Sequence, residues 1–476
     1  MVFSSMVFLC GFLPVVLTVY ALCPVRFRNF FLFIASLFFY AWGEPRYIVI
    51  MLFSTVFDYA NGIVMEYLDR REKPQYRKWV LMLSVVVNIG ILCFFKYTDF
   101  VLESVGTLTG HPLPLLKLAL PIGISFYTFQ TLSYTIDVYR RKVEVQHNII
   151  DFGMYVCLFP QLIAGPIVRY SDVAEQIRNR RGSGEERAYG AQRFIVGLAK
   201  KVLLANQIGD LWSQISVLSQ SDMSMSAAWL GAIAYTFQIY FDFSGYSDMA
   251  IGIALLLGFR FNINFDSPYQ SATITEFWRR WHISLSSWLK DYLYISLGGN
   301  RKGKIRTYMN LMITMLLGGL WHGASISFIL WGALHGIALA AHKFIMGHFS
   351  SFKALGCEMK PWRRVLGVLI TFHVVCFGWI LFRATSMKAV GEMLRQIFTN
   401  FHPEVFMQFV LGYKGVFALM VIGYVLHFMP KRSEDALRGV VTRSPLLIQA
   451  AILAIAIFIV VQFKSAGVQP FIYFQF

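Results

Sequence analysis

The amino-acid sequence predicts an all-α polytopic membrane protein. Hydrophobic residues make up 57% of the 476 residues and charged residues only 14%, whereas apolar residues account for about half of an ordinary soluble domain. The apolar residues form long segments, and a helix of about 20 residues spans the ~30 Å hydrocarbon layer of a bilayer. Neither a soluble domain nor an internal repeat interrupts these segments. We therefore expect a single membrane domain over residues 1–476.

Twelve apolar segments are candidates for membrane helices, and the shorter ones are also candidates for re-entrant helices. The first has no basic region before it and no small-residue cleavage site, so we expect a retained helix rather than a signal peptide. Close pairs of small residues, Gly319/Gly323 and Gly332/Gly336, indicate tight helix packing. The segments are residues 6–22, 29–42, 47–66, 79–98, 119–138, 190–208, 226–241, 306–321, 324–346, 364–382, 405–429 and 445–463.

Basic residues are concentrated between the apolar segments. The chain carries 43 Lys and Arg against 26 Asp and Glu, a net charge of +17. Such a distribution is typical of the cytoplasmic loops of membrane proteins, and it accounts for the charge without a nucleic-acid partner. It predicts cytoplasmic loops near residues 70, 141, 180, 301, 362 and 432. Ten or twelve crossings of the cytoplasmic (inner) membrane follow, with both termini on the extracytoplasmic side.

Familiar cofactor and metal motifs are missing. The six cysteines are scattered without close pairs, which indicates neither a disulfide framework nor a zinc site, and we expect no metal and no bound cofactor. Residues 298–304 match the spacing of a phosphate-binding loop. However, Ile305 replaces the Ser or Thr that binds magnesium, and no buried strand precedes the loop. We expect a basic cytoplasmic turn there.

Residues 276–294 form a Trp-rich, basic stretch with helical amphipathicity, at the start of a candidate donor-site segment at 276–304. Polar residues and Pro268 interrupt the chain just before it. Broken backbone at membrane depth is tolerated only inside protein or along a cavity. We therefore expect a cytoplasmic or re-entrant segment that roofs a cavity.

His322 is the strongest candidate for a catalytic residue. It lies in a very apolar run, and an ionisable residue within a membrane segment is a candidate functional group by default. Because burial favours the neutral imidazole, His322 is suited to accept a proton as a general base. The alternative is a histidine that forms a hydrogen bond across a helix interface.

His282 is the second candidate, with basic and aromatic neighbours. It follows Arg279 and Arg280, so a histidine in a membrane-surface anchor is the alternative reading. The neighbouring cations are suited to attract the phosphates of a cytoplasmic donor such as coenzyme A, although anionic lipid headgroups would attract them equally well. The candidate donor-binding residues are Trp278, Arg279, Arg280, Arg301 and Lys302.

Two further segments carry polar groups in apolar surroundings. Residues 240–248 contain Asp242, Ser244, Tyr246 and Asp248, and charges there must be paired or face water. They either line a cavity or serve capping and packing. Residues 471–476 alternate aromatic residues around Tyr473. An interfacial anchor is the default interpretation, and an acyl relay that threads Tyr473 toward His322 from outside is the alternative.

Together these motifs resemble the membrane-bound O-acyltransferase (MBOAT) family. The resemblance is carried by Trp-Arg-Arg-Trp-His-Ile-Ser at 278–284, Leu-Trp-His-Gly-Ala at 320–324 and the polar run at 240–248. Residues 1–5, 120–127, 297–303 and 471–476 are similar to the bacterial alginate O-acetyltransferase branch.

The resemblance implies a ring of about 10–12 transmembrane helices with re-entrant helices around a through-membrane tunnel. It also implies that His322 is the essential catalytic histidine and His282 the second motif histidine. Acetyl-CoA would be the donor substrate, and an extracytoplasmic esterase-like (SGNH-type) transferase the partner. Residues 445–476 would supply a last helix and an external aromatic tail.

The expected function is O-acetylation of an extracytoplasmic polymer. Alginate, cellulose and peptidoglycan all remain open as the final acceptor. A carrier-protein thioester is an alternative donor. The alternative from another class is a transporter or flippase for a polysaccharide or lipid intermediate, with the histidines as polar lining.

Overall fold

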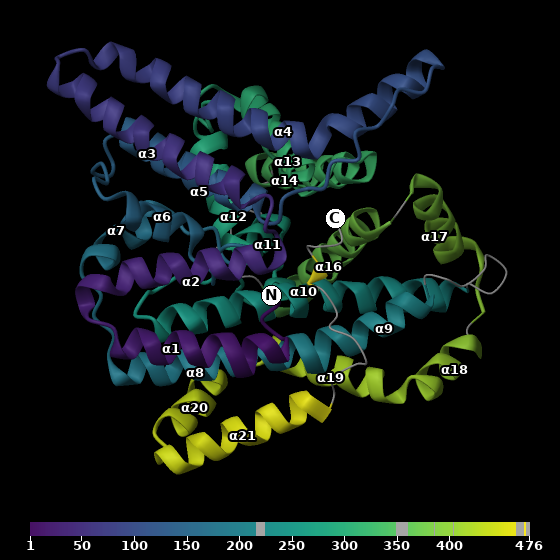
Figure 1. Cartoon of the computed structure of the whole chain (residues 1–476). Coiled ribbons are helices and arrows are strands. Elements are labelled where there is room, and N and C mark those ends of the chain that lie inside the picture. Colours follow the sequence, from purple (N-terminus) through teal and green to yellow (C-terminus); the bar gives the residue numbers. More distant parts are fainter. Residues whose placement is uncertain (216–223, 349–359, 385, 403, 463–470, 473–476) are drawn as a thin grey trace. The chain divides into compact units, whose positions relative to one another are not determined.

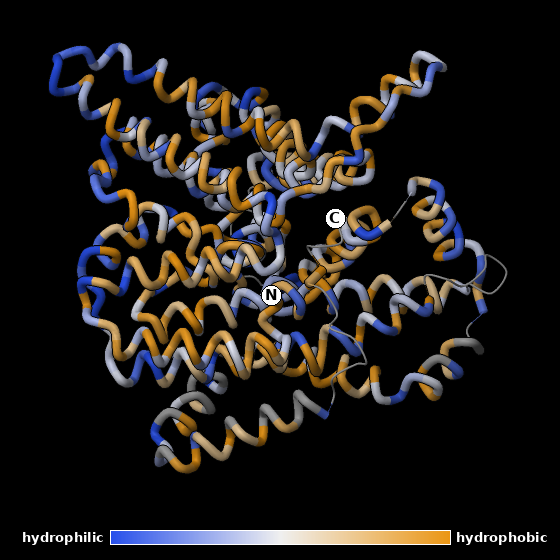
Figure 2. Tube along the Cα trace, in the orientation of Figure 1, coloured by the Kyte–Doolittle hydropathy of each residue, from blue (hydrophilic) through white to orange (hydrophobic). Residues whose placement is uncertain are grey.

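The described part of the chain is helical. The computed structural model describes residues 1–476 except 216–223, 349–359, 385, 403, 463–470 and 473–476. Helices and irregular connections make up these residues, and no strand occurs among them (Figure 1). Hydrophobic residues predominate along the bodies of the helices, and hydrophilic residues gather at their ends and connections (Figure 2). The predicted all-α class is confirmed.

The described residues cluster into two compact units. The first comprises Met1–Phe194 and Tyr246–Asn262, and the second comprises Ile195–Gly245 and Ile263–Phe476. The single domain over residues 1–476 stays a prediction.

The first unit is built around α5 (Ile124–Tyr139), most of whose side chains are buried. It packs against α3 (Ile48–Arg70) and α4 (Arg77–Thr109). Asp58 on α3 is fully buried and accepts hydrogen bonds from Ser84 at 2.6 Å and Asn88 at 2.8 Å on α4, so its polar atoms are satisfied inside the helix packing. The other helices are α1 (Leu13–Leu22), α2 (Arg28–Gly43), α6 (Ile149–Cys157), α7 (Tyr170–Arg178) and the first part of α8 (Gly184–Ala199).

In the second unit, α13 (Lys304–His322) and α14 (Ile326–His348) form a tight hairpin. A Cβ atom added at Gly319 would lie 2.2 Å from the carbonyl oxygen of Phe328, and one at Gly332 would lie 2.5 Å from that of Met315. The two helices can approach this closely only because these positions lack side chains, so the packing role predicted for the glycines is confirmed.

Short helical pieces precede this hairpin. They are α11 (Ile274–Arg280), α12 (Ile283–Trp288) and the π-helix η6 (Leu289–Tyr294), which leads into a turn at residues 295–303. Pieces of six or seven residues are far too short to cross a bilayer. The remaining elements are the π-helix η4 (Lys200–Ala205), α9 (Asn206–Ile215), α10 (Met225–Leu256), α16 (Pro361–Arg383), α17 (Met387–Thr399), α18 (Glu404–Gly412), α19 (Lys414–Phe428), α20 (Lys431–Thr442) and α21 (Leu446–Gln462).

Four helices within the described residues are long and apolar enough to cross a membrane. These are Ile48–Arg70, Pro74–Thr109, Ile326–His348 and Pro361–Arg383, and the bent pair Phe406–Gly412 and Lys414–Phe428 would make a fifth. Several other apolar segments are shorter or interrupted; the one at 190–208, for example, is divided among α8, η4 and α9. The count of ten or twelve crossings stays a prediction.

Candidate functional site

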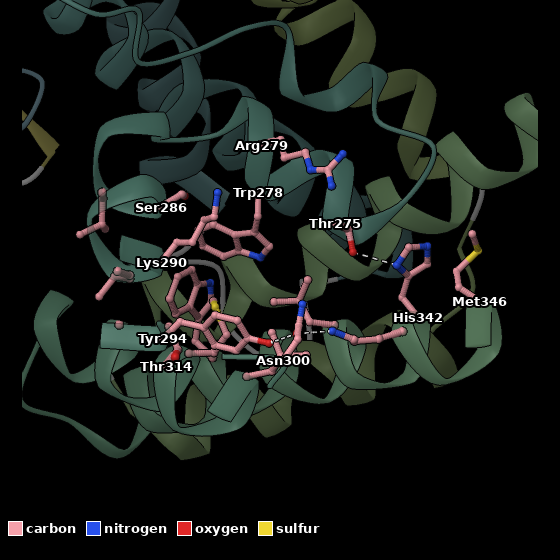
Figure 3. A pocket seen from close by; sticks show the side chains of 18 of the residues that line it. Thr275, Trp278, Arg279, Ser286, Lys290, Tyr294, Asn300, Thr314, His342 and Met346 are labelled. Atoms are coloured by element: carbon pink, nitrogen blue, oxygen red, sulfur yellow. Dashed lines mark hydrogen bonds between the residues drawn. The ribbon is translucent and has the colours of Figure 1, made fainter. Parts of the chain in front are cut away.

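A cavity of about 490 Å³ lies in the second unit, where the short pieces before the hairpin meet α13 and α14 (Figure 3). This size is typical of small-molecule sites. Most of its surface is apolar. The lining residues are Thr275, Trp278, Arg279, Leu285, Ser286, Leu289, Lys290, Tyr294, Asn300, Leu311, Thr314, Met315, Gly318, His322, Trp331, Leu339, His342, Lys343 and Met346.

A few polar groups converge on the cavity. The Oδ1 atom of Asn300 accepts hydrogen bonds from Lys343 Nζ at 2.6 Å and from Tyr294 Oη at 2.5 Å. Thr275 Oγ1 lies 2.8 Å from His342 Nδ1. Figure 3 shows both networks, with Lys290, Trp278 and Tyr294 on one side of the cavity and Thr275 and His342 on the other.

The charge of the lining is positive. Arg279, Lys290 and Lys343 contribute cations, and no Asp or Glu occurs among the lining residues of the described chain. An apolar interior beneath a basic rim suits a ligand with an apolar or weakly polar arm and an anionic head.

The turn at residues 298–303 places Asn300 at the cavity. Gly298, Gly299 and Gly303 have φ angles of 105°, 54° and 86°, a region that favours glycine. Asn310 of α13 holds the turn by donating to the carbonyl oxygen of Gly299 at 3.0 Å. The expectation of a turn rather than a phosphate-binding loop is confirmed, since no strand precedes it.

His322 is the last residue of α13 and lines the cavity with 9% of its surface exposed. The edges of Trp331 and Phe382 meet its ring, with centroids 5.2 Å and 5.0 Å away. Gly323 follows, and a Cβ there would lie 2.1 Å from the ring of Phe328. The aromatic frame around His322 therefore depends on the glycine after it.

His282 is fully buried and does not line the cavity. The alternative of a histidine in a membrane-surface anchor is wrong, because the His282 side chain is enclosed by protein. Its backbone is left-handed, with φ of 43°. Asn264 anchors the turn: its Oδ1 lies 3.1 Å from His282 Nδ1 and accepts hydrogen bonds from the backbone N–H and the hydroxyl of Ser284.

The hydrogen bonds around Asn264 assign the tautomer of His282. Because Oδ1 of Asn264 is an acceptor, Nδ1 of His282 carries the proton and Nε2 is left as an acceptor. Within the described residues Nε2 has no hydrogen-bond partner. Burial lowers the pKa of His282 to about 3, so the ring is neutral at physiological pH.

Trp321 links the two histidines. Its ring centroid lies 6.2 Å from that of His282 and 4.9 Å from that of His322. The two histidines thus share one aromatic neighbour, although only His322 reaches the cavity.

The predicted donor-binding residues divide into two groups. Trp278 and Arg279 line the cavity, whereas Arg280, Arg301 and Lys302 do not. For Arg280 the structure corrects the prediction: its guanidinium is paired with Glu276 at 3.0 Å and Asp266 at 3.8 Å. Arg301 and Lys302 are exposed on the turn.

None of the four polar residues predicted between 240 and 248 lines this cavity. Asp242 is buried in an ion pair with Lys201, and Asp248 pairs with Arg193 at 2.9 Å. Tyr246 stacks on Phe3 with centroids 4.6 Å apart, and Ser244 is buried. In the described structure these residues are paired or packed, and their role stays a prediction. Tyr473 lies outside the described residues.

Several lining residues were not predicted from the sequence. Asn300, Lys343 and Lys290 line the cavity but were not predicted as site residues. His342 also lines the cavity, although it was not among the predicted site residues. The available signal was the polar pair His342–Lys343, which interrupts the apolar sequence of α14. Within the described residues no group of three His, Cys, Asp or Glu side chains is arranged to hold a metal ion.

The sequence profile of the membrane-bound O-acyltransferase family matches residues 34–390, which include every residue that lines the cavity. The chain belongs to the membrane-bound O-acyltransferase family. It is therefore a multi-pass membrane O-acyltransferase, and this assignment favours an enzyme over the transporter or flippase.

The names of similar proteins refer to alginate, peptidoglycan and teichoic acid. The chain is 47% identical to "Probable alginate O-acetylase AlgI" of Pseudomonas syringae pv. tomato over 404 residues, 84% of this chain and 75% of the relative. It is 36% identical to the peptidoglycan O-acetyltransferase of Helicobacter pylori over 428 residues, 83% of this chain and 79% of the relative. It is 26% identical to the teichoic acid D-alanyltransferase of Bacillus subtilis over 273 residues, 55% of this chain and 68% of the relative.

Proposed function

We propose that this enzyme transfers acetyl from cytoplasmic acetyl-CoA to an acceptor on the outer side of the cytoplasmic membrane. The observation that carries the proposal is His322 at the wall of an apolar cavity lined by three cations. A carrier-protein thioester is the less favoured donor, since the cations near the cavity match the several phosphates of coenzyme A.

The cavity suggests how the donor binds. The pantetheine arm occupies the apolar interior, and the phosphates lie near Arg279, Lys290 and Lys343. The thioester then lies within reach of His322. Binding of this kind holds donor and acceptor at one place, which removes much of the entropic barrier to reaction.

His322 acts as the general base. Its imidazole takes the proton of the acceptor hydroxyl, and the oxygen attacks the thioester carbon. The C–S bond breaks, and the leaving thiolate receives the proton from His322, so that CoA is released as a thiol on the cytoplasmic side. General-base catalysis of this kind contributes roughly 10²–10⁴-fold to a rate.

His282 supports the reaction from outside the cavity. It contacts Trp321, the ring neighbour of His322, so it orients the aromatic frame of the base. Direct polarisation of the thioester is less favoured, because His282 does not line the cavity.

The proposed final acceptor is an alginate-like exopolysaccharide, with peptidoglycan as the second candidate. The 47% identity to the alginate O-acetylase against 36% to the peptidoglycan enzyme supports this order. We further propose that Tyr473 receives acetyl as a relay and that an esterase-like partner takes it onward. The proposed topology has both termini outside.

Sided membrane vesicles test the function. Inside-out vesicles that contain the enzyme and its enclosed acceptor are supplied with acetyl-CoA labelled in the acetyl group. We expect CoA thiol to appear outside and label inside, with no CoA entering. Label and CoA that enter together would instead indicate transport.

A further inference from the structure

Phe471 and Ile472 are buried in the second unit, with 1% and 2% of their surfaces exposed. The backbone N–H of Ile472 donates a hydrogen bond of 2.7 Å to Oδ2 of Asp242 on α10. The other carboxylate oxygen of Asp242 forms the ion pair with Lys201 of η4. Asp242 and Lys201 are themselves only 2% and 4% exposed.

Close helix packing brings the two charges together. A Cβ at Gly245 would lie 2.8 Å from the carbonyl oxygen of Gly197, so α10 approaches the end of α8 where η4 begins. Lys201 lies in the π-helical turn of η4, and π-helical turns are frequent at functional sites.

Packing alone does not explain a buried ion pair. Removing two charges from water costs several kcal/mol per ion, and well-packed apolar residues often replace such a pair without loss of stability. A charged carboxylate, however, is a strong acceptor for a backbone N–H. The pair thus supplies an acceptor that apolar side chains lack, and this acceptor holds residues 471–472 by the backbone N–H of Ile472.

The held segment lies beside the second histidine. Phe471 contacts Phe243, the neighbour of Asp242, with ring centroids 5.8 Å apart. Phe243 in turn contacts His282 in a T-shaped arrangement, with ring centroids 4.6 Å apart. Phe243 is therefore the ring that separates Phe471 from His282.

We propose that Lys201 and Asp242 form a clasp that holds residues 471–472 and so positions the chain that follows for acyl transfer. They are positioning residues and do not touch the donor. The proposal rests on the proposed function, in which Tyr473 accepts the acetyl group.

Two double variants distinguish loss of the hydrogen bond to Ile472 from a general loss of folding. Lys201→Met with Asp242→Asn removes both charges but keeps an oxygen that accepts the Ile472 N–H. Lys201→Met with Asp242→Leu removes both charges and the acceptor. Neither variant leaves a lone charge in the interior, so we expect both to fold, with similar melting temperatures.

The readouts are hydrogen exchange at Ile472 and acetyl-transfer kinetics in the full-length enzyme with its partner. We expect at least tenfold faster exchange and at least tenfold lower kcat in the leucine variant than in the asparagine variant. KM for acetyl-CoA should agree within about twofold, since the donor cavity is untouched. A merely structural role would change both kinetic constants.

Equal exchange at Ile472 in the two variants would overturn the clasp, and faster exchange with equal kcat would overturn its positioning role. Tyr473→Phe is assayed in parallel. Wild-type transfer by Tyr473→Phe would refute the relay of the proposed function, and the exchange comparison would still decide whether the pair holds the segment.

Discussion

At the scale of single residues, two buried histidines differ in what surrounds them. His322 lines the cavity, whereas His282 is enclosed and tied by Nδ1 to Asn264. The sequence pointed to His322 because a polar residue stands out in an apolar run. It misplaced His282, because its immediate neighbours are basic, and only the inward turn anchored by Asn264 buries it.

Because His282 is buried, we expect it to lower the stability of the folded protein at acidic pH. Its pKa is about 3 in the folded protein and ~6.5 in an unfolded chain. Below pH 6.5 the unfolded chain binds a proton that the folded protein does not, so stability falls as the pH falls from 6.5 toward 3, by about 1.4 kcal/mol per pH unit. We expect His282→Asn to reduce the slope of melting temperature against pH between 6.5 and 4.5 in detergent. An unchanged slope would contradict the assigned burial.

At the scale of elements, the amphipathic stretch at 276–304 was predicted as a cavity roof, and its residues do line the cavity. The role of Arg280 was missed even though Glu276 lies four residues before it, a spacing that pairs side chains on a helix. Asn300 and Lys343 come from distant segments, so only the folded turn and hairpin bring them together.

We expect substitutions of the cations that line the cavity to weaken acetyl-CoA binding, and substitutions of surface cations to leave it unchanged. Arg279→Met and Lys343→Met should each raise KM for acetyl-CoA about tenfold, the equivalent of one charge-assisted hydrogen bond, with a smaller change in kcat. Arg301→Met and Lys302→Met are matched controls on the exposed turn, and their KM should stay within twofold. Initial rates at varied acetyl-CoA measure both constants. Equal effects in the two groups would refute this cavity as the donor site.

Two glycines of the α13–α14 hairpin should differ in their tolerance of a substitution to alanine. Gly332→Ala should destabilise the protein by about 1–3 kcal/mol through overpacking against Met315. Gly347→Ala on the same helix meets no atom within 4 Å and should be neutral or stabilising by up to about 1 kcal/mol. Thermal unfolding in detergent compares them. A Gly332→Ala variant as stable as Gly347→Ala would show that the helices have room to separate.

At the scale of the whole molecule, composition was enough to predict an all-α membrane protein, because bilayer burial demands long apolar segments. The helix limits were less predictable, since breaks such as η4 depend on tertiary contacts. The Lys201–Asp242–Ile472 arrangement could not be predicted, because Asp242 and Ile472 are separated by 230 positions. Family membership gives the reaction class, and we propose the cavity as the place of the reaction.

We propose that His322 is the base in the transfer of acetyl from the cytoplasmic donor. Labelled acetyl transfer is measured in inside-out vesicles that carry His322→Ala. His373→Ala is the control, because His373 is exposed on α16 and does not line the cavity. We expect at least a hundredfold loss for His322→Ala at normal protein levels and nearly full activity for His373→Ala. Transfer by His322→Ala at the wild-type rate would contradict this proposal.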